Sequence, residues 1–127
     1  MKLMKLMKAR KAMKLKYTPW GEFCNVFGVT PRNRILECFL EGREVDFSIG
    51  AVAQITGLNR ATAYNEAKRL IKEKYLIPTR RISGAQFYKL NFHKREVKFL
   101  IMVFDKVLNM IGEEHKKKFP QEQRVYA

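Results

Sequence analysis

The first helical pattern in the chain lies between Thr30 and Gly42. Threonine can cap a helix and proline is favoured at the first helical position, so Thr30–Pro31 is a typical helix start. Apolar residues then recur at i, i+1, i+4 and i+5, on one face: Ile35, Leu36, Phe39 and Leu40. The pattern predicts an amphipathic helix that ends at Gly42.

Two shorter helices are expected after a possible short strand at 45–47. Ser48 is a good cap for the first of them, and Gly57 closes it. Asn59 caps the second, which runs to about Lys74. The sequence therefore predicts two helices joined by a tight turn.

Residues 76–82 and 85–90 predict two strands joined at Ser83–Gly84, a dipeptide that suits a tight hairpin. Pro78 cannot donate a main-chain hydrogen bond, so its strand should lie at a sheet edge.

The last helical pattern starts at Asn91 or His93 and ends at Gly112. It carries a broad apolar stripe made of Val97, Leu100, Ile101, Phe104, Val107, Leu108 and Ile111. A second stripe, more than about 100° away around the helix, consists of Phe99, Val103 and Met110. One apolar surface is enough to cover a small core, so the second also needs to be buried.

A second copy of the same helix would cover this surface and give a two-fold dimer. The dimerisation residues are then expected to be Phe99, Leu100, Val103, Phe104, Val107, Met110 and Ile111. In the alternative, aromatic residues before the first helix fold back and cover it within one chain: Tyr17, Trp20, Phe23 and Phe27.

The positive charge is concentrated in two parts of the chain. The 127 residues carry a net charge of +14, with +7 in residues 1–17 and +6 in residues 58–90. Lysines in 1–16 spiral around a helix instead of forming one face, which favours a solvated arm over a membrane helix. The longest apolar run, 99–104, is too short to span a membrane. Two such blocks indicate a polyanionic partner.

The segment 52–77 has the features of a helix-turn-helix. Ala53 supplies a small residue where the helices cross, Gly57 permits positive φ in the turn, and Leu58 fills the space beneath it. On the second helix the inward positions are Ala63, Ala67, Leu70 and Ile71. The outward positions are basic and amide-bearing, as expected for a helix that enters the major groove of DNA.

Residues 27–92 resemble winged helix-turn-helix transcription regulators of the broad MarR/ArsR-like type, with small archaeal winged-helix DNA-binding proteins nearest. The resemblance rests on FGVTPRNRILECFL, on segment 52–77 and on FYKLN. It implies a mainly α fold with a small β-hairpin, α+β, and a long C-terminal dimerisation helix. The sequence departs from the family pattern at Ala67 and Lys74, where a larger aliphatic residue and glycine are frequent.

The resemblance implies four parts: a basic arm (1–16), a winged helix-turn-helix with an aromatic lead-in (17–92), a dimerisation helix (93–112) and a polar tail (113–127). Arg60, Thr62 and Asn65, flanked by Tyr64, are candidates for base edges. Lys68, Arg69 and Lys72 are candidates for phosphates. By the resemblance the hairpin is the wing, and its DNA-binding residues are Arg80, Arg81 and Gln86.

The predicted function is sequence-specific binding of double-stranded DNA by a cytoplasmic, homodimeric transcription regulator, without enzymatic activity, cofactor, metal or membrane partner. A two-fold dimer predicts a near-palindromic site with half-sites about 34 Å apart. His93 and His115 have no catalytic partners in the sequence, and Cys24 and Cys38 have no zinc-ligand spacing. Cys38 is expected to be packed and Cys24 exposed. A winged-helix protein-interaction module and a sequence-blind architectural DNA-binding protein remain alternatives. No effector is indicated.

Overall fold

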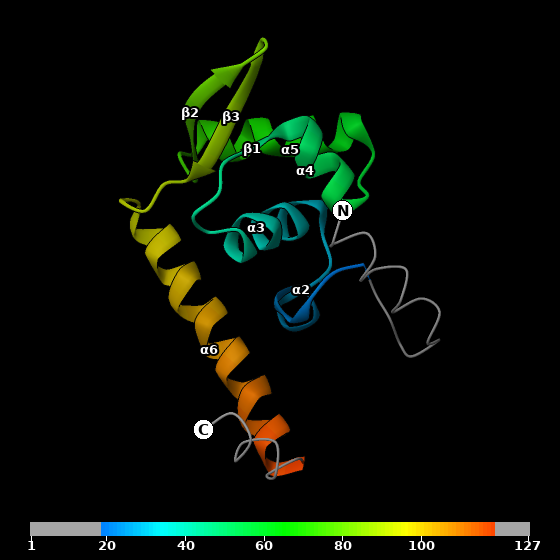
Figure 1. The fold of residues 1–127 in the computed structure, drawn as a ribbon, viewed down its shortest axis with the longest axis vertical. Helices are drawn as coiled ribbons and strands as arrows, with labels where there is room; N and C mark the ends of the chain where they lie inside the picture. Colours follow the sequence, from blue (N-terminus) through cyan, green and yellow to red (C-terminus); the bar gives the residue numbers. More distant parts are fainter. Residues whose placement is uncertain (1–18, 119–127) are drawn as a thin grey trace. The chain divides into compact units, whose positions relative to one another are not determined.

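A computed structural model describes residues 19–118, with side chains to residue 114. The predicted arm at 1–16 and residues 119–127 of the predicted tail lie outside this part. The chain divides into two compact units, Met1–Asn91 and Phe92–Ala127. The first holds the elements α2 (Glu22–Phe27), α3 (Pro31–Glu41), β1 (Phe47–Ser48), α4 (Ile49–Thr56), α5 (Arg60–Lys72), β2 (Leu76–Ile82) and β3 (Ala85–Leu90), and the second holds α6 (Arg95–Lys118) (Figure 1). This is the expected mainly α fold with a hairpin.

The three predicted helix starts of the first unit are confirmed by their caps. The Thr30 hydroxyl accepts a hydrogen bond from the Asn33 amide at 3.0 Å. Ser48 and Asn59 cap α4 and α5 in the same way, each accepting from a main-chain amide of the first turn. These bonds satisfy amides that have no partner inside a helix, which is why short sequence motifs locate them.

The sheet has the order β1-β3-β2, and both pairings are antiparallel. β2 is therefore an edge strand, which confirms the prediction from Pro78. Ser83 and Gly84 have φ values of 49° and 82° and form the predicted two-residue turn, with Ile82 opposite Ala85. The predicted strand at 45–47 is wrong in its bounds, because the paired residues are Phe47 and Ser48.

The core of the first unit is built on α3, where all four predicted apolar residues are buried, with Phe39 packed edge-to-face on Phe47 at 5.3 Å between ring centroids. One acid is buried with them. Glu37 accepts hydrogen bonds from the amides of Gly21 and Cys24, at 2.8 and 3.0 Å, and so holds the start of α2. The charge is tolerated because it is hydrogen-bonded at a helix N-terminus.

Both cysteines are buried and free, so the expected exposure of Cys24 is wrong. Burial raises the pKa of Cys24 to about 12, and the charge of Glu37 acts in the same direction. Burial also raises the pKa of Cys38 to about 12. Because a thiolate is needed for disulfide exchange, neither thiol of the folded chain is suited to bridging two subunits.

The second unit is a helix that is longer than predicted. α6 continues through Gly112 to Lys118, so the expected end at Gly112, with a tail starting at residue 113, is wrong. A single glycine inside a helix costs only about 1 kcal/mol, which the surrounding helix formers offset. No helix of residues 19–118 combines the length and the apolar character that crossing a membrane requires.

Lys74 stands where the regulators that the sequence resembles frequently have glycine, and it has a φ of 68° just after α5. This left-handed conformation costs a residue with a side chain about 1–2 kcal/mol, and glycine pays no such penalty. We expect Lys74→Gly to raise the free energy of unfolding by about 0.5–1 kcal/mol in urea denaturation. Lys68→Gly, inside α5, is the control and should lower it by about 1 kcal/mol. A loss of stability in Lys74→Gly would contradict this account.

Candidate nucleic-acid interface

The corner between α4 and α5 is closely packed through small side chains. Ala53 of α4 lies in one buried cluster with Ala63 and Ala67 of α5, and the partly buried Leu58 packs against it. Gly57 has a φ of 73°, and its amide donates to the carbonyl of Ala53 at 2.9 Å. The predicted roles of Ala53, Gly57 and Leu58 are confirmed. Ala67 is smaller than the aliphatic residue that is frequent here in the regulators that the sequence resembles, and it lets α4 and α5 approach closely.

Two arginines of α3, which the sequence analysis did not single out, tie this corner to the core. Arg34 donates to the carbonyl of Thr56 at the end of α4 and lies 5.7 Å from the Trp20 ring centroid. Arg32 donates to Glu73 at 2.8 Å, just after α5. The two arginines of α3 thus hold the end of α4, just before the turn, and the residue that follows α5.

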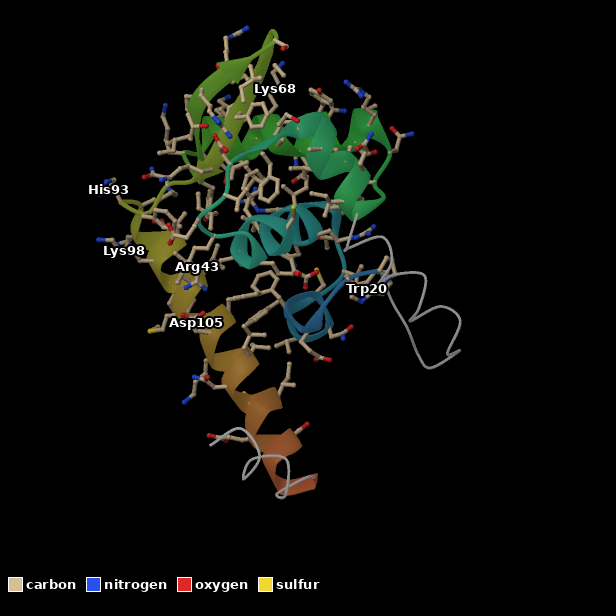
Figure 2. The ribbon with its side chains drawn as sticks, in the orientation of Figure 1. Trp20, Arg43, Lys68, His93, Lys98 and Asp105 are labelled. Carbon is tan, nitrogen blue, oxygen red and sulfur yellow. The ribbon has the colours of Figure 1, made fainter. Side chains whose placement is uncertain are left out.

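The outer face of α5 is open to solvent. All of its predicted DNA-binding residues are exposed except Thr62, which is half-buried: Arg60, Tyr64, Asn65, Lys68, Arg69 and Lys72 (Figure 2 labels Lys68). The inward residues Ala63, Ala67 and Leu70 are buried, as predicted. The helix therefore presents four basic side chains and an amide on a rigid scaffold.

Acidic side chains do little to offset this charge. Glu66 is half-buried and lies 3.9 Å from Arg69, a distance that allows only a weak surface ion pair. Glu73 is engaged by Arg32. The lysines on the outer face of α5, Lys68 and Lys72, have no ion pair among those found in the described part of the chain.

Arg60 is ordered by its own helix. Its guanidinium donates to the Tyr64 hydroxyl at 3.3 Å and lies 5.3 Å from the centroid of the Tyr64 ring. Gly50 of α4 lies beside this pair: a Cβ built there would be 3.7 Å from the guanidinium, an ordinary van der Waals distance. Tyr64 thereby restricts the rotamers of Arg60, which reduces the entropy cost of any further contact.

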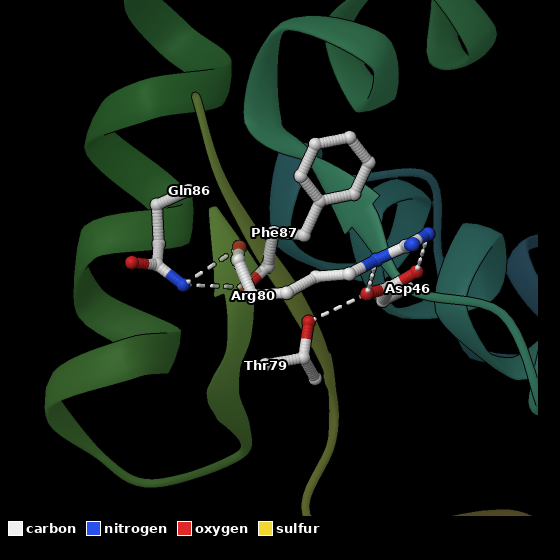
Figure 3. A network of polar contacts seen from close by, with 5 residues as sticks. All are labelled: Asp46, Thr79, Arg80, Gln86 and Phe87. Carbon is white, nitrogen blue, oxygen red and sulfur yellow. Dashed lines mark hydrogen bonds and ion pairs between the residues drawn. The ribbon is translucent and has the colours of Figure 1, made fainter. Parts of the chain in front are cut away.

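The three predicted wing residues differ in their surroundings. Arg80 makes two bonds to the Asp46 carboxylate, at 2.8 and 3.0 Å (Figure 3). Gln86 donates to the main-chain carbonyls of Arg80 and Phe87. Arg81 is exposed and makes a long bond of 3.4 Å to the carbonyl of Gly84 at the hairpin tip. Arg81 makes no ion pair with an acid in the described part of the chain.

The Arg80 guanidinium lowers the pKa of Asp46 below its usual range, and the Thr79 hydroxyl adds to this effect. The carboxylate is therefore ionised at neutral pH and the pair is intact. Among the residues with described side chains, no three His, Cys, Asp or Glu groups come together to hold a metal ion.

The sequence matches no family model and no curated protein. Among solved structures it is similar to NadR bound to 4-hydroxyphenylacetate, with a TM-score of 0.53 and 17% identity over 97% of this chain and 86% of that one. MepR, a transcription regulator of a Staphylococcus aureus multidrug efflux pump, gives 0.52 and 10% over 98% and 90%. AdcR, the adhesin competence repressor of Streptococcus pyogenes, gives 0.51 and 15% over 98% and 87%.

MepR is a transcription regulator and AdcR is a repressor, and the similarity of this chain to all three proteins is one of fold. The winged helix-turn-helix predicted from the sequence, and its resemblance to regulators of the broad MarR/ArsR-like type, are confirmed at the level of the fold, which has a three-stranded antiparallel sheet and a long C-terminal helix. The nearness to archaeal proteins stays a prediction.

Proposed function

We propose that the protein is a sequence-specific regulator of transcription that binds double-stranded DNA as a homodimer. The observation that carries the proposal is the outer face of α5, where the basic residues and Asn65 are exposed on a helix fixed by its neighbours. A helix of this kind fits the major groove, whose base edges and flanking phosphates offer hydrogen-bond acceptors.

The division of roles follows from position along α5. Arg60, Thr62 and Asn65 lie in the first half, where such helices contact base edges, with Tyr64 holding Arg60. Lys68, Arg69 and Lys72 lie in the second half, where long cations contact phosphates. The hairpin would then contact the adjacent backbone or minor groove through Arg81.

The proposed dimer uses the apolar surface of α6. Phe99 and Met110, from the second apolar stripe, are 59% and 57% exposed, and Ile111 is 39% exposed. Large apolar side chains grouped on one exposed surface are typical of a protein interface. Phe104 and Val107, also predicted for the dimer, are only 7% and 9% exposed, so their side chains have little area left for a partner.

Selection of binding sites from a pool of random duplexes tests the function. We expect a near-palindromic sequence with half-sites about one helical turn apart, bound at least about 1,000-fold more tightly than random duplex. Equal affinity for selected and random duplexes would identify a sequence-blind architectural protein. An absence of duplex binding even at low salt would favour a protein-interaction module.

A further inference from the structure

The edge strand of the hairpin is irregular near its middle. Pro78 pairs with Tyr88 and Arg81 pairs with Gln86, so the two residues Thr79 and Arg80 oppose the single residue Phe87. This is a β-bulge, in which the extra residue bends the strand and changes the direction of its side chains.

Both residues of the bulge bind the same carboxylate. The Thr79 hydroxyl donates to Asp46 Oδ2 at 2.6 Å, and Arg80 donates to the two Asp46 oxygens (Figure 3). In a regular strand, neighbouring side chains point to opposite faces, so these two could not share one partner so readily. The bulge makes the shared contact possible.

The contact joins the two outer strands of the sheet across the central one. Asp46 directly precedes β1, whereas Thr79 and Arg80 lie in β2, and β3 runs between them. The Arg80 guanidinium crosses β3 over the ring of Phe87, 5.3 Å from its centroid. Gln86 donates to the main-chain carbonyl of Arg80 at 3.1 Å. Both the side chain and the backbone of Arg80 are therefore held by hydrogen bonds.

We infer that Asp46, Thr79 and Arg80 form a brace that sets the direction of the wing, and that Arg80 is a positioning residue instead of a DNA ligand. The inference rests on the proposed function for its DNA-binding part. Arg80 forms an ion pair with Asp46, whose side chain is only 16% exposed. Arg81 lies nearer the hairpin tip and is exposed, so its charge is available to the duplex.

The sign of one substitution separates this role from direct contact. Asp46→Asn removes a negative charge, which by electrostatics alone would strengthen binding to DNA. If Arg80 were a phosphate ligand restrained by Asp46, freeing it would raise affinity further and steepen the salt dependence. A brace predicts the opposite result, because a loosened wing holds Arg81 less well.

The experiment uses the full chain and two readouts. Hydrogen exchange of the amides of residues 79–86 is measured without DNA. Duplex affinity is measured from about 50 to 300 mM salt, a range in which affinity that depends on phosphate contacts falls steeply. We expect Asp46→Asn to speed exchange and to weaken binding, each about three- to tenfold. Glu44→Gln, which removes a neighbouring exposed acid, is the control and should leave exchange unchanged.

A second pair of variants compares adjacent arginines under the same chemical change. Arg80→Gln should speed exchange but leave the slope of log Kd against log salt unchanged, and Arg81→Gln should lower that slope by about 1 with exchange unchanged. Unchanged exchange in Asp46→Asn, or tighter binding with a steeper slope, would overturn the brace. If exchange responds as expected and the wild type itself does not bind DNA, the brace stands and the proposed function is wrong.

Discussion

Replacing both Lys68 and Arg69 with glutamate should weaken binding to every duplex about 100-fold near 0.1 M salt. Each phosphate contact on B-DNA releases about 0.9 counterion. At 0.1 M salt this release makes the affinity about tenfold higher per contact than at 1 M salt. Both side chains are exposed, and neither belongs to the proposed base-reading set, so selected and random sequences should lose affinity alike.

The measurement is a titration of labelled duplex, selected and random, at several salt concentrations. The slope of log Kd against log salt should fall by about 2, and the difference from the wild type should shrink toward 1 M salt. A loss confined to the selected sequence would mean that these residues read bases. Wild-type affinity that does not change with salt would contradict the phosphate contacts altogether.

A matched control keeps the same change of net charge. Arg95→Glu with Lys98→Glu alters two exposed cations of α6 by the same amount. If affinity depended only on net charge, the two double variants would bind equally weakly. We expect the α6 control to stay within about threefold of the wild type, because α6 carries no proposed phosphate contact and the attraction of charges outside the contact is screened by salt.

Local chemistry explains why so much of the helix-turn-helix could be predicted. The caps at Thr30, Ser48 and Asn59 and the left-handed Gly57 each depend on two to four neighbouring residues, so the sequence alone locates them. The hairpin is equally local, since Ser83–Gly84 sets the register of both its strands. Even the edge position of β2 follows from one proline.

The parts that could not be predicted depend on residues far apart in the chain. Asp46 meets Arg80 from 34 positions away, and Glu37 meets Gly21 from 16. Arg34, which no sequence pattern distinguishes, binds the end of α4. Spacing patterns carry no information about such contacts. The sequence therefore assigns the same DNA-binding role to Arg80 and Arg81, although of these two only Arg80 is paired with an acid, Asp46.

The long helix shows a third kind of limit. Periodicity identifies its two apolar stripes, but it does not give the exposure of each side chain. In the structure, exposure separates residues of one predicted interface: Phe104 is buried, whereas Phe99 and Met110 are exposed. A test of the dimer should therefore leave Phe104 intact, because charging it would also disturb folding.

Phe99→Lys combined with Met110→Lys should convert the proposed dimer into a folded monomer. Burying one such side chain is worth at least about 1.5 kcal/mol, and a two-fold interface contains each residue twice. The loss is then about 6 kcal/mol, or a dissociation constant raised roughly 10⁴-fold. Sedimentation across a dilution series gives the mass, and circular dichroism checks the helix content.

Adjacent positions supply the control for charge. Met110→Lys and Asn109→Lys add the same charge one residue apart, but the two side chains point about 100° apart around the helix. Only Met110→Lys should weaken the dimer. Loss of the dimer should also reduce affinity for a palindromic duplex to that for a single half-site, since the second contact is no longer linked to the first. If the double variant keeps the dimer mass at the lowest concentrations measured, the subunits associate through another surface.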